Sequence, residues 1–367
     1  MAQALSAPSD RLRDRERPPG EVFAALDLGT NNCRLLVATP TARGFRIVDA
    51  YSRIVRLGEG LSQTGRLSED AMARAISALR VCADKIQRRG VVRVRAIATQ
   101  ACRSAENGAA FLEQVAAETG LRLSIITPRE EAQLSVAGCL NLLDREADAA
   151  LVLDVGGGST ELSWIDLKAP GLDVEPRRMA HWRLPIKAWL SVPMGVVTLA
   201  ERHPEGEAGD RAWFRRMVED VKAEIEPFPH AAPMREAFDR GRAHLIGTSG
   251  AITSLAGLHL GLPRYERNQV DGLWMTRAEC DAVASRLASM TPAERAAQPC
   301  IGPDRADLVL AGAAILQAVQ ELWPCERVRV ADRGLREGLL LSLMSEQRRR
   351  RGRRRSRGGR HSAVAKT

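Results

Sequence analysis

Three stretches of this sequence place glycines beside hydroxyl, amide and carboxylate side chains, which is the composition of a phosphate-binding loop. The first is DLGTNN at 27–32, the second is DVGGGST at 154–160, and the third is GTSG at 247–250. Glycine lets backbone N–H groups approach a phosphate closely, and hydroxyl and amide groups complete its coordination. The three stretches therefore indicate a site that binds a polyphosphate group.

An aspartate precedes each of the first two glycine stretches and offers the oxygen ligand that Mg²⁺ prefers. Asp27 and Asp154 can hold this ion directly or through water, so that it neutralises charge on a transferring phosphoryl group. This role requires Asp27 to be exposed in a cleft. The candidate phosphate ligands lie within the three stretches and are Gly29, Thr30, Asn31, Asn32, Gly156, Gly157, Gly158, Ser159, Thr160, Gly247, Ser249 and Gly250.

The first two stretches each lie between apolar segments that read as strands, so each glycine turn joins two strands as a hairpin. A Walker loop or a dinucleotide fingerprint would open a helix instead, and neither motif is present. Either stretch alone is more often an ordinary turn or linker. Asp27 and Asp154 stand 127 positions apart, and this domain-sized repeat predicts two similar halves that face each other, each with a carboxylate-tipped hairpin.

The elements that position these stretches follow from periodicity and caps. A helix is expected from Ser68 as N-cap to the basic residues before Gly90, and another opens at Pro128. Strands are expected within 45–57, 91–99 and 121–127, and a helix within 107–120. The predicted order up to residue 143 is β-β-β-α-β-α-β-α, and the third glycine stretch joins a short apolar strand to a helix.

Charge and cysteine usage narrow the class of protein. The chain has 367 residues and a net charge of +9, but residues 347–367 alone hold nine Arg, one Lys and no acid. The near-neutral body argues against a fold that reads nucleic acid and leaves the basic tail for nonspecific polyanion contact. Seven scattered cysteines predict reduced thiols in a cytoplasmic protein, and no segment reads as a signal peptide or membrane span. Residues 1–20 and 347–367 are expected to be disordered.

The motifs together resemble the exopolyphosphatase and guanosine pentaphosphate phosphatase family (Ppx/GppA), which lies within the actin-like ATPase superfamily. The resemblance covers about residues 21–345 and implies an α/β protein with two ribonuclease-H-like domains facing an interdomain cleft. Domain I would span 21–130 and be completed by a C-terminal helix at about 334–346, and domain II would span 131–333. The motifs that carry it, in order, are AALDLGTNNCRLLVA, RLGEGLSQTGRLSEDAM, ATQACRSAENGAAFL, REEAQL, LVLDVGGGSTELSW, SVPMGVVTLAE, GTSGAITSLAG and VRVADRGLREGLLL.

The resemblance also implies roles for single residues. Glu131 matches the family's base that activates water, and Arg103 matches an arginine that faces substrate phosphate. Glu161 matches a residue of the second loop and joins Asp27 and Asp154 as a metal ligand. These roles suit the side chains, because a carboxylate can accept a proton and a guanidinium can hold phosphate through two hydrogen bonds.

Some residues depart from the family's pattern. Thr30-Asn31-Asn32 replaces Ser-Asn-Ser in the first loop, and Arg129 and Gln133 replace a glycine and an arginine on either side of the expected base. Residues 177–190 read as an insertion that carries basic side chains and two tryptophans. This insertion is either a basic substrate lip or a packing surface for a neighbouring element or a second copy of the chain in a homodimer.

The resemblance implies release of the terminal phosphate from linear inorganic polyphosphate or from guanosine pentaphosphate (pppGpp), with Mg²⁺. We expect the short form of the family, without its C-terminal HD-type domain, and favour polyphosphate over pppGpp. An ATP-dependent kinase of the same superfamily is a weaker alternative, because no sugar-binding insertion of domain size is visible. We expect no membrane partner.

Overall fold

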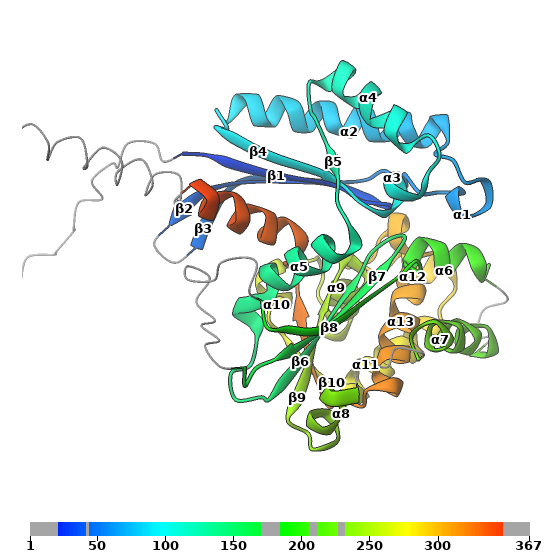
Figure 1. The fold of residues 1–367 in the computed structure, drawn as a ribbon. Coiled ribbons are helices and arrows are strands. Elements are labelled where there is room, and N and C mark those ends of the chain that lie inside the picture. Colours follow the sequence, from blue (N-terminus) through cyan, green and yellow to red (C-terminus); the bar gives the residue numbers. More distant parts are fainter. Residues whose placement is uncertain (1–20, 42–43, 170–183, 206–210, 227–231, 348–367) are drawn as a thin grey trace, which may run out of the picture.

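Two mixed β-sheets organise the molecule (Figure 1). The computed structural model describes residues 21–41, 44–169, 184–205, 211–226 and 232–347. The strand order is β3-β2-β1-β4-β5 in the first sheet and β10-β11-β9-β6-β7-β8 in the second. β1 pairs antiparallel with β2 and parallel with β4, and β6 pairs in the same way with β7 and β9. The two halves therefore repeat one topology, which confirms the predicted ribonuclease-H-like fold class.

The first sheet and helices α1 to α4 form what we call the first lobe. Its strands are β1 (Phe23–Leu28), β2 (Asn32–Thr41), β3 (Gly44–Ile54), β4 (Arg93–Ala98) and β5 (Ser124–Ile125). Its helices are α1 (Leu61–Thr64), α2 (Glu69–Arg88), α3 (Gln100–Ser104) and α4 (Gly108–Thr119). The chain then passes to the other half through α5 (Pro128–Cys139) and η1 (Leu140–Leu142).

The second sheet and helices α6 to α13 form the second lobe. Its strands are β6 (Ala149–Val155), β7 (Thr160–Asp166), β8 (Ile186–Val192), β9 (Ala243–Thr248), β10 (Trp274–Thr276) and β11 (Arg327–Ala331). Its helices are α6 (Val196–Arg202), α7 (Arg211–Ile225), α8 (Ala232–Asp239), α9 (Gly250–His259), α10 (Arg267–Val270), α11 (Arg277–Ala288), α12 (Pro292–Ala296), η3 (Pro303–Arg305) and α13 (Val309–Leu322). Residues 335–347 are helical and return to the first lobe.

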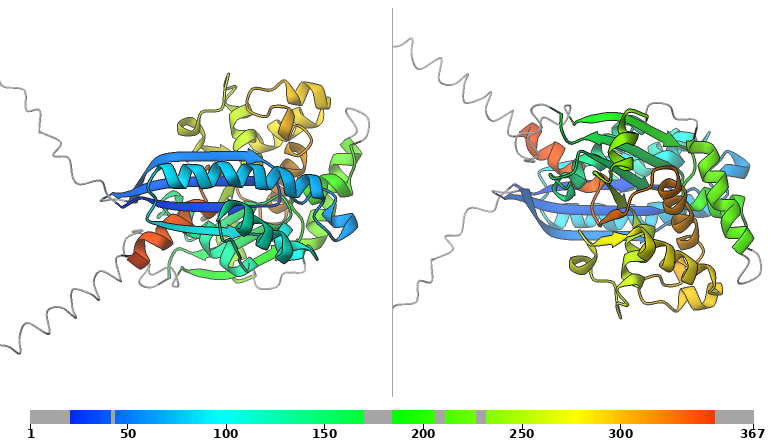
Figure 2. Two further views of the ribbon diagram at one scale, coloured as in Figure 1. Left: turned by 90° about the horizontal axis from the view of Figure 1, so that it is seen from above. Right: turned by 90° about the horizontal axis from the view of Figure 1, so that it is seen from below.

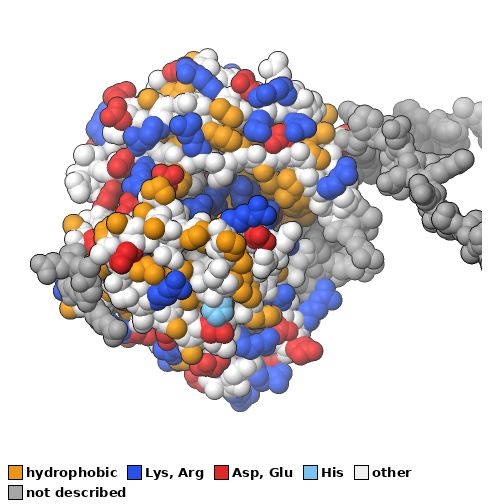
Figure 3. Space-filling model, turned by 180° about the vertical axis from the view of Figure 1, so that it is seen from behind, with side chains coloured by type: hydrophobic (Ala, Val, Ile, Leu, Met, Phe, Trp, Pro, Cys, Tyr) orange, Lys and Arg blue, Asp and Glu red, His pale blue; other side chains and the backbone are white. Residues whose placement is uncertain are grey.

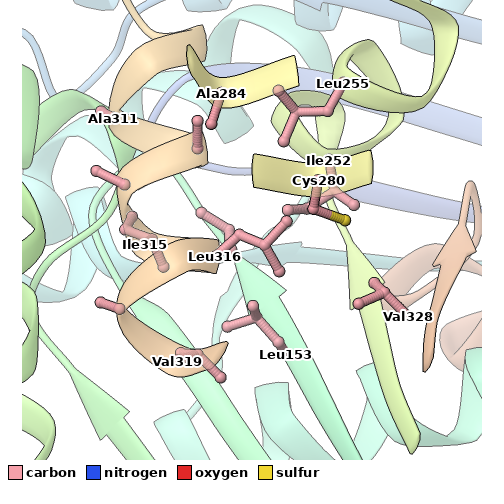
Figure 4. Packing of buried hydrophobic residues seen from close by; sticks show 14 of the residues in the cluster. Leu153, Ile252, Leu255, Cys280, Ala284, Ala311, Ile315, Leu316, Val319 and Val328 are labelled. Atoms are coloured by element: carbon pink, nitrogen blue, oxygen red, sulfur yellow. The ribbon is translucent and has the colours of Figure 1, made fainter. Parts of the chain in front are cut away.

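The central strands β1 and β6 are continuous apolar runs whose successive side chains point to opposite faces, so each sheet is apolar and covered on both sides. On the first sheet, Leu26 and Leu35 pack with α2 and α4, whereas Phe23 and Leu36 pack with the 335–347 helix. Seen from above, α2 lies over this sheet and the red 335–347 helix lies beneath it (Figure 2). On the second sheet, Leu153 and its neighbours pack against α9, α11 and α13 (Figure 4).

Two helices cross between the lobes side by side. α5 covers the inner face of the second sheet, and the 335–347 helix covers the inner face of the first. Their backbones touch at glycines, because a Cβ on Gly138 would overlap the carbonyl oxygen of Gly334, and a Cβ on Gly338 would overlap that of Leu134. The lobes are therefore joined by two chain segments in direct backbone contact.

Several sequence-based predictions can be compared with these elements. The helix after Ser68 is confirmed as α2, with the Ser68 hydroxyl accepting from the backbone N–H of Ala71, and the helix opened by Pro128 is confirmed as α5. The strand expected within 121–127 is reduced to Ser124–Ile125, since these residues lie at the sheet edge. All seven cysteines are free and buried. None of the helices in the described ranges is long and apolar enough to cross a membrane.

The second part of the expected 177–190 insertion does not form the substrate lip that was one of its two interpretations. Residues from Ile186 onward form β8, an edge strand of the second sheet, because β7 offers an unpaired edge and the segment alternates. Lys187 lies 3.4 Å from Asp166 on β7 rather than over a cleft. Residues 177–183, with His181 and Arg183, lie outside the described residues.

Candidate active site

A cavity of about 140 Å³ lies between the two lobes and is lined by both. Figure 3 shows the molecule hollowed between its halves, with basic side chains gathered in the hollow. Most of the residues that the sequence singled out line this cavity: Asp27, Gly29, Thr30, Asn31, Asn32, Glu131, Asp154, Gly156, Gly157, Gly158, Ser159, Glu161, Ser249 and Gly250. The fold thus brings all three glycine stretches to one place.

The first two glycine stretches meet each other directly across the cavity. An ideal Cβ on Gly157 would lie 3.0 Å from the backbone nitrogen of Asn31, and one on Gly158 would lie 2.8 Å from the Thr30 hydroxyl. The distance at Gly158 is shorter than real Cβ contacts and the distance at Gly157 lies at their lower limit, so glycine at both positions permits the close approach of the lobes. This adds a second reason for the glycines beyond the approach of a phosphate.

Backbone hydrogen bonds fix the two loops from behind. In the second loop, the N–H groups of Val196 and Val197, which begin α6, donate to the carbonyls of Gly156 and Gly157 at 3.0 and 2.8 Å. In the first loop, the Asn31 carbonyl accepts from Val55 at 2.8 Å. Because each loop is held by its own lobe, the cavity changes shape when the lobes move relative to each other.

Six carboxyl side chains line the cavity, and burial raises the pKa of the four that the sequence singled out. Burial raises the pKa of Asp27 to about 6 and that of Glu161 to about 7, and it raises the pKa of Asp154 as well. Burial and the neighbouring Glu161 raise the pKa of Glu131 well above its usual range. Groups with displaced pKa values in a cleft are typical of functional sites, and a cation would relieve their mutual repulsion.

Glu131 is held by Arg103 inside the protein. It lies on the first turn of α5, only 7% exposed, and its Oε2 accepts from the two terminal nitrogens of Arg103 at 3.2 and 3.3 Å. The same guanidinium donates to the Ile126 carbonyl at 2.7 Å and to Gln100 at 2.6 Å. Arg103 does not line the cavity, so the structure places it behind Glu131, where it orients the carboxylate.

Two other predicted phosphate ligands also lie outside the cavity. The Thr160 side chain is fully buried, and its hydroxyl donates to the Met194 carbonyl at 2.7 Å. Gly247 lies within the buried strand β9, where a Cβ would be 2.9 Å from Ile252. Both residues support the loops from within the second lobe instead of facing a ligand.

The carboxylates fit a magnesium ion only in part. Within the described ranges, no group of three or more His, Cys, Asp or Glu side chains lies close enough together to hold a metal ion. Asp27, Asp154 and Glu161 therefore do not form the three-residue ligand set that was expected, because they stand on different strands around the cavity. Asp27 is half-buried rather than exposed, and its Oδ1 is buried without a hydrogen-bond partner. An unpartnered carboxylate oxygen suits Mg²⁺, which takes one or two carboxylates and completes its shell with water and substrate phosphate.

Apart from Arg333, which forms an ion pair with Asp271, three arginines that line the cavity were not singled out from the sequence: Arg34 from β2, Arg305 from η3 and Arg336 from the 335–347 helix. No ion pair of theirs is found within the described part of the chain. Arg34 reaches the start of α9, since one of its terminal nitrogens lies 3.4 Å from an ideal Cβ on Gly250. Burial and Arg336 lower the pKa of Arg34, so a polyanion in the cavity would be bound by groups that otherwise repel each other.

Comparisons with known proteins agree with this geometry. A model described as the Ppx/GppA phosphatase family matches residues 36–347. Exopolyphosphatase 2 of Mycobacterium tuberculosis is 30% identical over 335 residues, which are 87% of this chain and 98% of that protein. The guanosine-5'-triphosphate,3'-diphosphate pyrophosphatase of Photobacterium profundum is 27% identical over 340 residues, 90% of this chain but 61% of that protein. A crystal structure of the Aquifex aeolicus Ppx/GppA family member has a TM-score of 0.70 at 27% identity, covering 89% of this chain and 98% of that one.

Proposed function

The chain belongs to the Ppx/GppA phosphatase family, and from this premise we propose that it is an exopolyphosphatase that releases the terminal phosphate of linear inorganic polyphosphate. The observation that carries this proposal is the position of Glu131. Its buried carboxyl group lines the cavity together with both aspartate-tipped glycine loops and three arginines without ion pairs in the described ranges. A base beside a polyanion site suits hydrolysis of a phosphoric anhydride.

In the proposed reaction, Glu131 in its ionised form accepts a proton from water as the water attacks the terminal phosphorus. Arg103, which donates twice to Glu131, holds the carboxylate in one orientation and favours its charged form. The backbone N–H groups of the first and second loops offer donors to the terminal phosphate, and Arg34 and Arg336 offer charge to the phosphates that follow. Catalysis of this kind rests on positioning and on stabilisation of charge.

Mg²⁺ is part of the proposal. Asp27 and Asp154 are the residues that would hold it, and Glu161, which accepts from the Ser191 hydroxyl at 2.8 Å, would stand behind them. When bound, the ion would neutralise charge on the phosphoryl oxygens.

Guanosine pentaphosphate is the second candidate substrate, because the Photobacterium profundum relative is named for guanosine-5'-triphosphate,3'-diphosphate, which carries five phosphates. Polyphosphate is favoured because the alignment with a protein named exopolyphosphatase spans 98% of that relative, against 61% of the Photobacterium protein. The two substrates share a terminal phosphoric anhydride, so the cavity residues named above serve either.

The test is phosphate release measured as kcat/KM for tripolyphosphate, long-chain polyphosphate, pppGpp and ATP with the same enzyme and Mg²⁺ concentration. The proposal expects polyphosphate to be preferred. Glu131→Gln should lower kcat by roughly 10² to 10⁴ with little change in KM, because a general base contributes about that much. Glu130→Gln is the matched control, since Glu130 is the neighbouring residue and forms its ion pair with Arg95 outside the cavity. Retention of more than a tenth of wild-type kcat by Glu131→Gln would refute the assignment.

A further inference from the structure

The lobes make a further contact at the rim of the cleft, apart from the crossing of α5 and the 335–347 helix and from the meeting of the two glycine loops. Arg56, which follows β3 in the first lobe, donates to both carboxylate oxygens of Asp307 in the second lobe at 2.8 and 3.0 Å. The same guanidinium donates to the Asp304 carbonyl at 3.2 Å. This bidentate arrangement fixes the direction of the guanidinium as well as its distance.

A second carboxylate of the second lobe adds to the rim contact. Glu201 on α6 accepts from the Gly60 N–H at 2.9 Å and from the Ser62 hydroxyl at 2.6 Å. A cavity of about 200 Å³ beside these contacts is lined by both lobes, with Arg56, Glu201 and Asp307 in its wall. The rim is therefore held by two polar contacts rather than by a packed apolar interface. Polar contacts of this kind between domains can open and close.

The backbone of Arg56 also helps to hold the first glycine loop in place. Its own backbone N–H donates to the Asn31 carbonyl at 3.1 Å, and the N–H of Gly58 donates to the Thr30 carbonyl at 2.9 Å. Arg56 has φ of 46°, and it is the one residue other than glycine with a positive φ in the described ranges. An arginine in the left-handed region is strained and persists only where its surroundings require it.

The partners of Arg56 bracket a residue of the active site. Asp304 and Asp307 lie on either side of Arg305, which lines the substrate cavity together with Leu308. One side chain thus connects the backbone of the first phosphate loop to the segment that carries Arg305 into the cavity. A movement that separates Arg56 from Asp307 would separate these two parts of the site.

We propose that Arg56 is a positioning residue that holds the lobes in the closed arrangement and so sets the first phosphate loop and Arg305 at the spacing needed for substrate. The inference rests on the proposed function for its substrate, but the contact itself is testable without turnover. The 335–347 and α5 crossing acts as the hinge, and the Arg56–Asp307 pair acts as the latch on the far rim. If the closed form is populated less, the apparent affinity falls by the same fraction.

The kinetic test uses Arg56→Ala, Arg56→Gly, Asp307→Asn and the double variant Arg56→Ala/Asp307→Asn, with tripolyphosphate as substrate. Each should raise KM by about three- to tenfold, the range of a half-exposed bidentate ion pair, and leave kcat within about twofold, because saturating substrate itself closes the lobes. The double variant should be no worse than the single ones. Arg56→Gly separates the latch from backbone strain, since glycine accepts φ of 46° but has no guanidinium. Arg66→Ala is the matched control, because Arg66 pairs with Glu106 on the surface of the first lobe.

The structural test is hydrogen–deuterium exchange of peptides covering 29–32 and 58–62 without substrate. If Arg56 and Asp307 form the latch, both peptides should exchange faster in the Arg56 and Asp307 variants than in the wild type. Arg66→Ala should exchange at the wild-type rate. Normal KM and normal exchange in Asp307→Asn would overturn the proposal, whatever the Arg56 variants do. A different result is faster exchange in the variants together with a wild-type enzyme that releases no phosphate from any polyphosphate. That result would support the latch and refute the proposed function.

Discussion

Removing the charge of Glu161 should stabilise the metal-free protein. Glu161 is 3% exposed, and burial together with Asp154 raises its pKa from 4.5 to about 7. At or above pH 7, where the group is ionised, this difference in pKa between the unfolded and folded states lowers the free energy of unfolding by about 3 kcal/mol, at about 1.4 kcal/mol per pH unit. Gln keeps an oxygen for the Ser191 hydroxyl but loses the charged character of that hydrogen bond, about 1 kcal/mol. The free energy of unfolding of Glu161→Gln should therefore exceed that of the wild type by about 2 kcal/mol.

The pH dependence of this gain has a definite sign. Because the folded pKa is raised, the folded state binds more protons than the unfolded state between about pH 4.5 and 7. The wild-type protein therefore loses stability as the pH rises through this window, whereas Glu161→Gln lacks this contribution. The difference in unfolding free energy between Glu161→Gln and the wild type should be near its minimum at pH 5 and reach its full value above pH 7.

The assay is chemical denaturation at pH 5, 6, 7 and 8 with EDTA present, followed by thermal unfolding at the same pH values. A gain of about 2 kcal/mol corresponds to roughly 4 to 8 °C for a unit of the size of the second lobe. Glu113→Gln on the exposed face of α4 is the control and should show no such trend. Parallel stability profiles for wild type and Glu161→Gln would show that Glu161 carries no buried charge, and the reasoning would fail.

Three further variants test the site and the crossing. Asp154→Asn should raise the Mg²⁺ concentration needed for half-maximal phosphate release, because an amide is a weaker ligand for a hard cation, and an unchanged titration would remove Asp154 from that role. Arg103→Met removes the positive charge beside Glu131, so the pKa of Glu131 should rise and the acidic limb of kcat/KM should move to higher pH, with Arg103→Lys restoring most of the shift. Gly138→Ala should cost about 1–3 kcal/mol of stability in a denaturant titration, since its Cβ would overlap Gly334; full stability would contradict the backbone contact.

The parts of the fold that were predictable depend on local pattern. The helix after Ser68 carries its own cap and apolar stripe, and the two aspartate-tipped hairpins carry both the strand pattern and the turn. β8 was not recognised because its pairing partner β7 comes from an earlier segment, so the residues around Trp189 read as an insertion. Pairing between distant segments leaves little trace in either segment alone.

Residues that line the cavity could be predicted from the sequence where they lie in the glycine loops, and less well where they lie on strands. Ser159 and Glu161 line the cavity while Thr160 points into the second lobe, as the alternation of β7 requires once the strand is known to begin there. Arg34 and Arg305 were missed because they are 271 positions apart and meet only when the lobes face each other. The spacing of Arg34 from Asp27 was the available signal, since these residues are opposite each other in the first hairpin.

The paired crossing of the chain limits how the lobes can move. Two bodies joined by one flexible segment keep six rigid-body degrees of freedom, three of translation and three of rotation. Here two helical segments touch at Gly138 and Gly334 and again at Leu134 and Gly338, so sliding and twisting at the junction would force backbone atoms together. Rotation about the line of contact remains as the soft coordinate. A single coordinate can be fixed by few distant constraints, so the polar contacts of Arg56 and Glu201 at the rim would be enough to define the opening of the whole cleft.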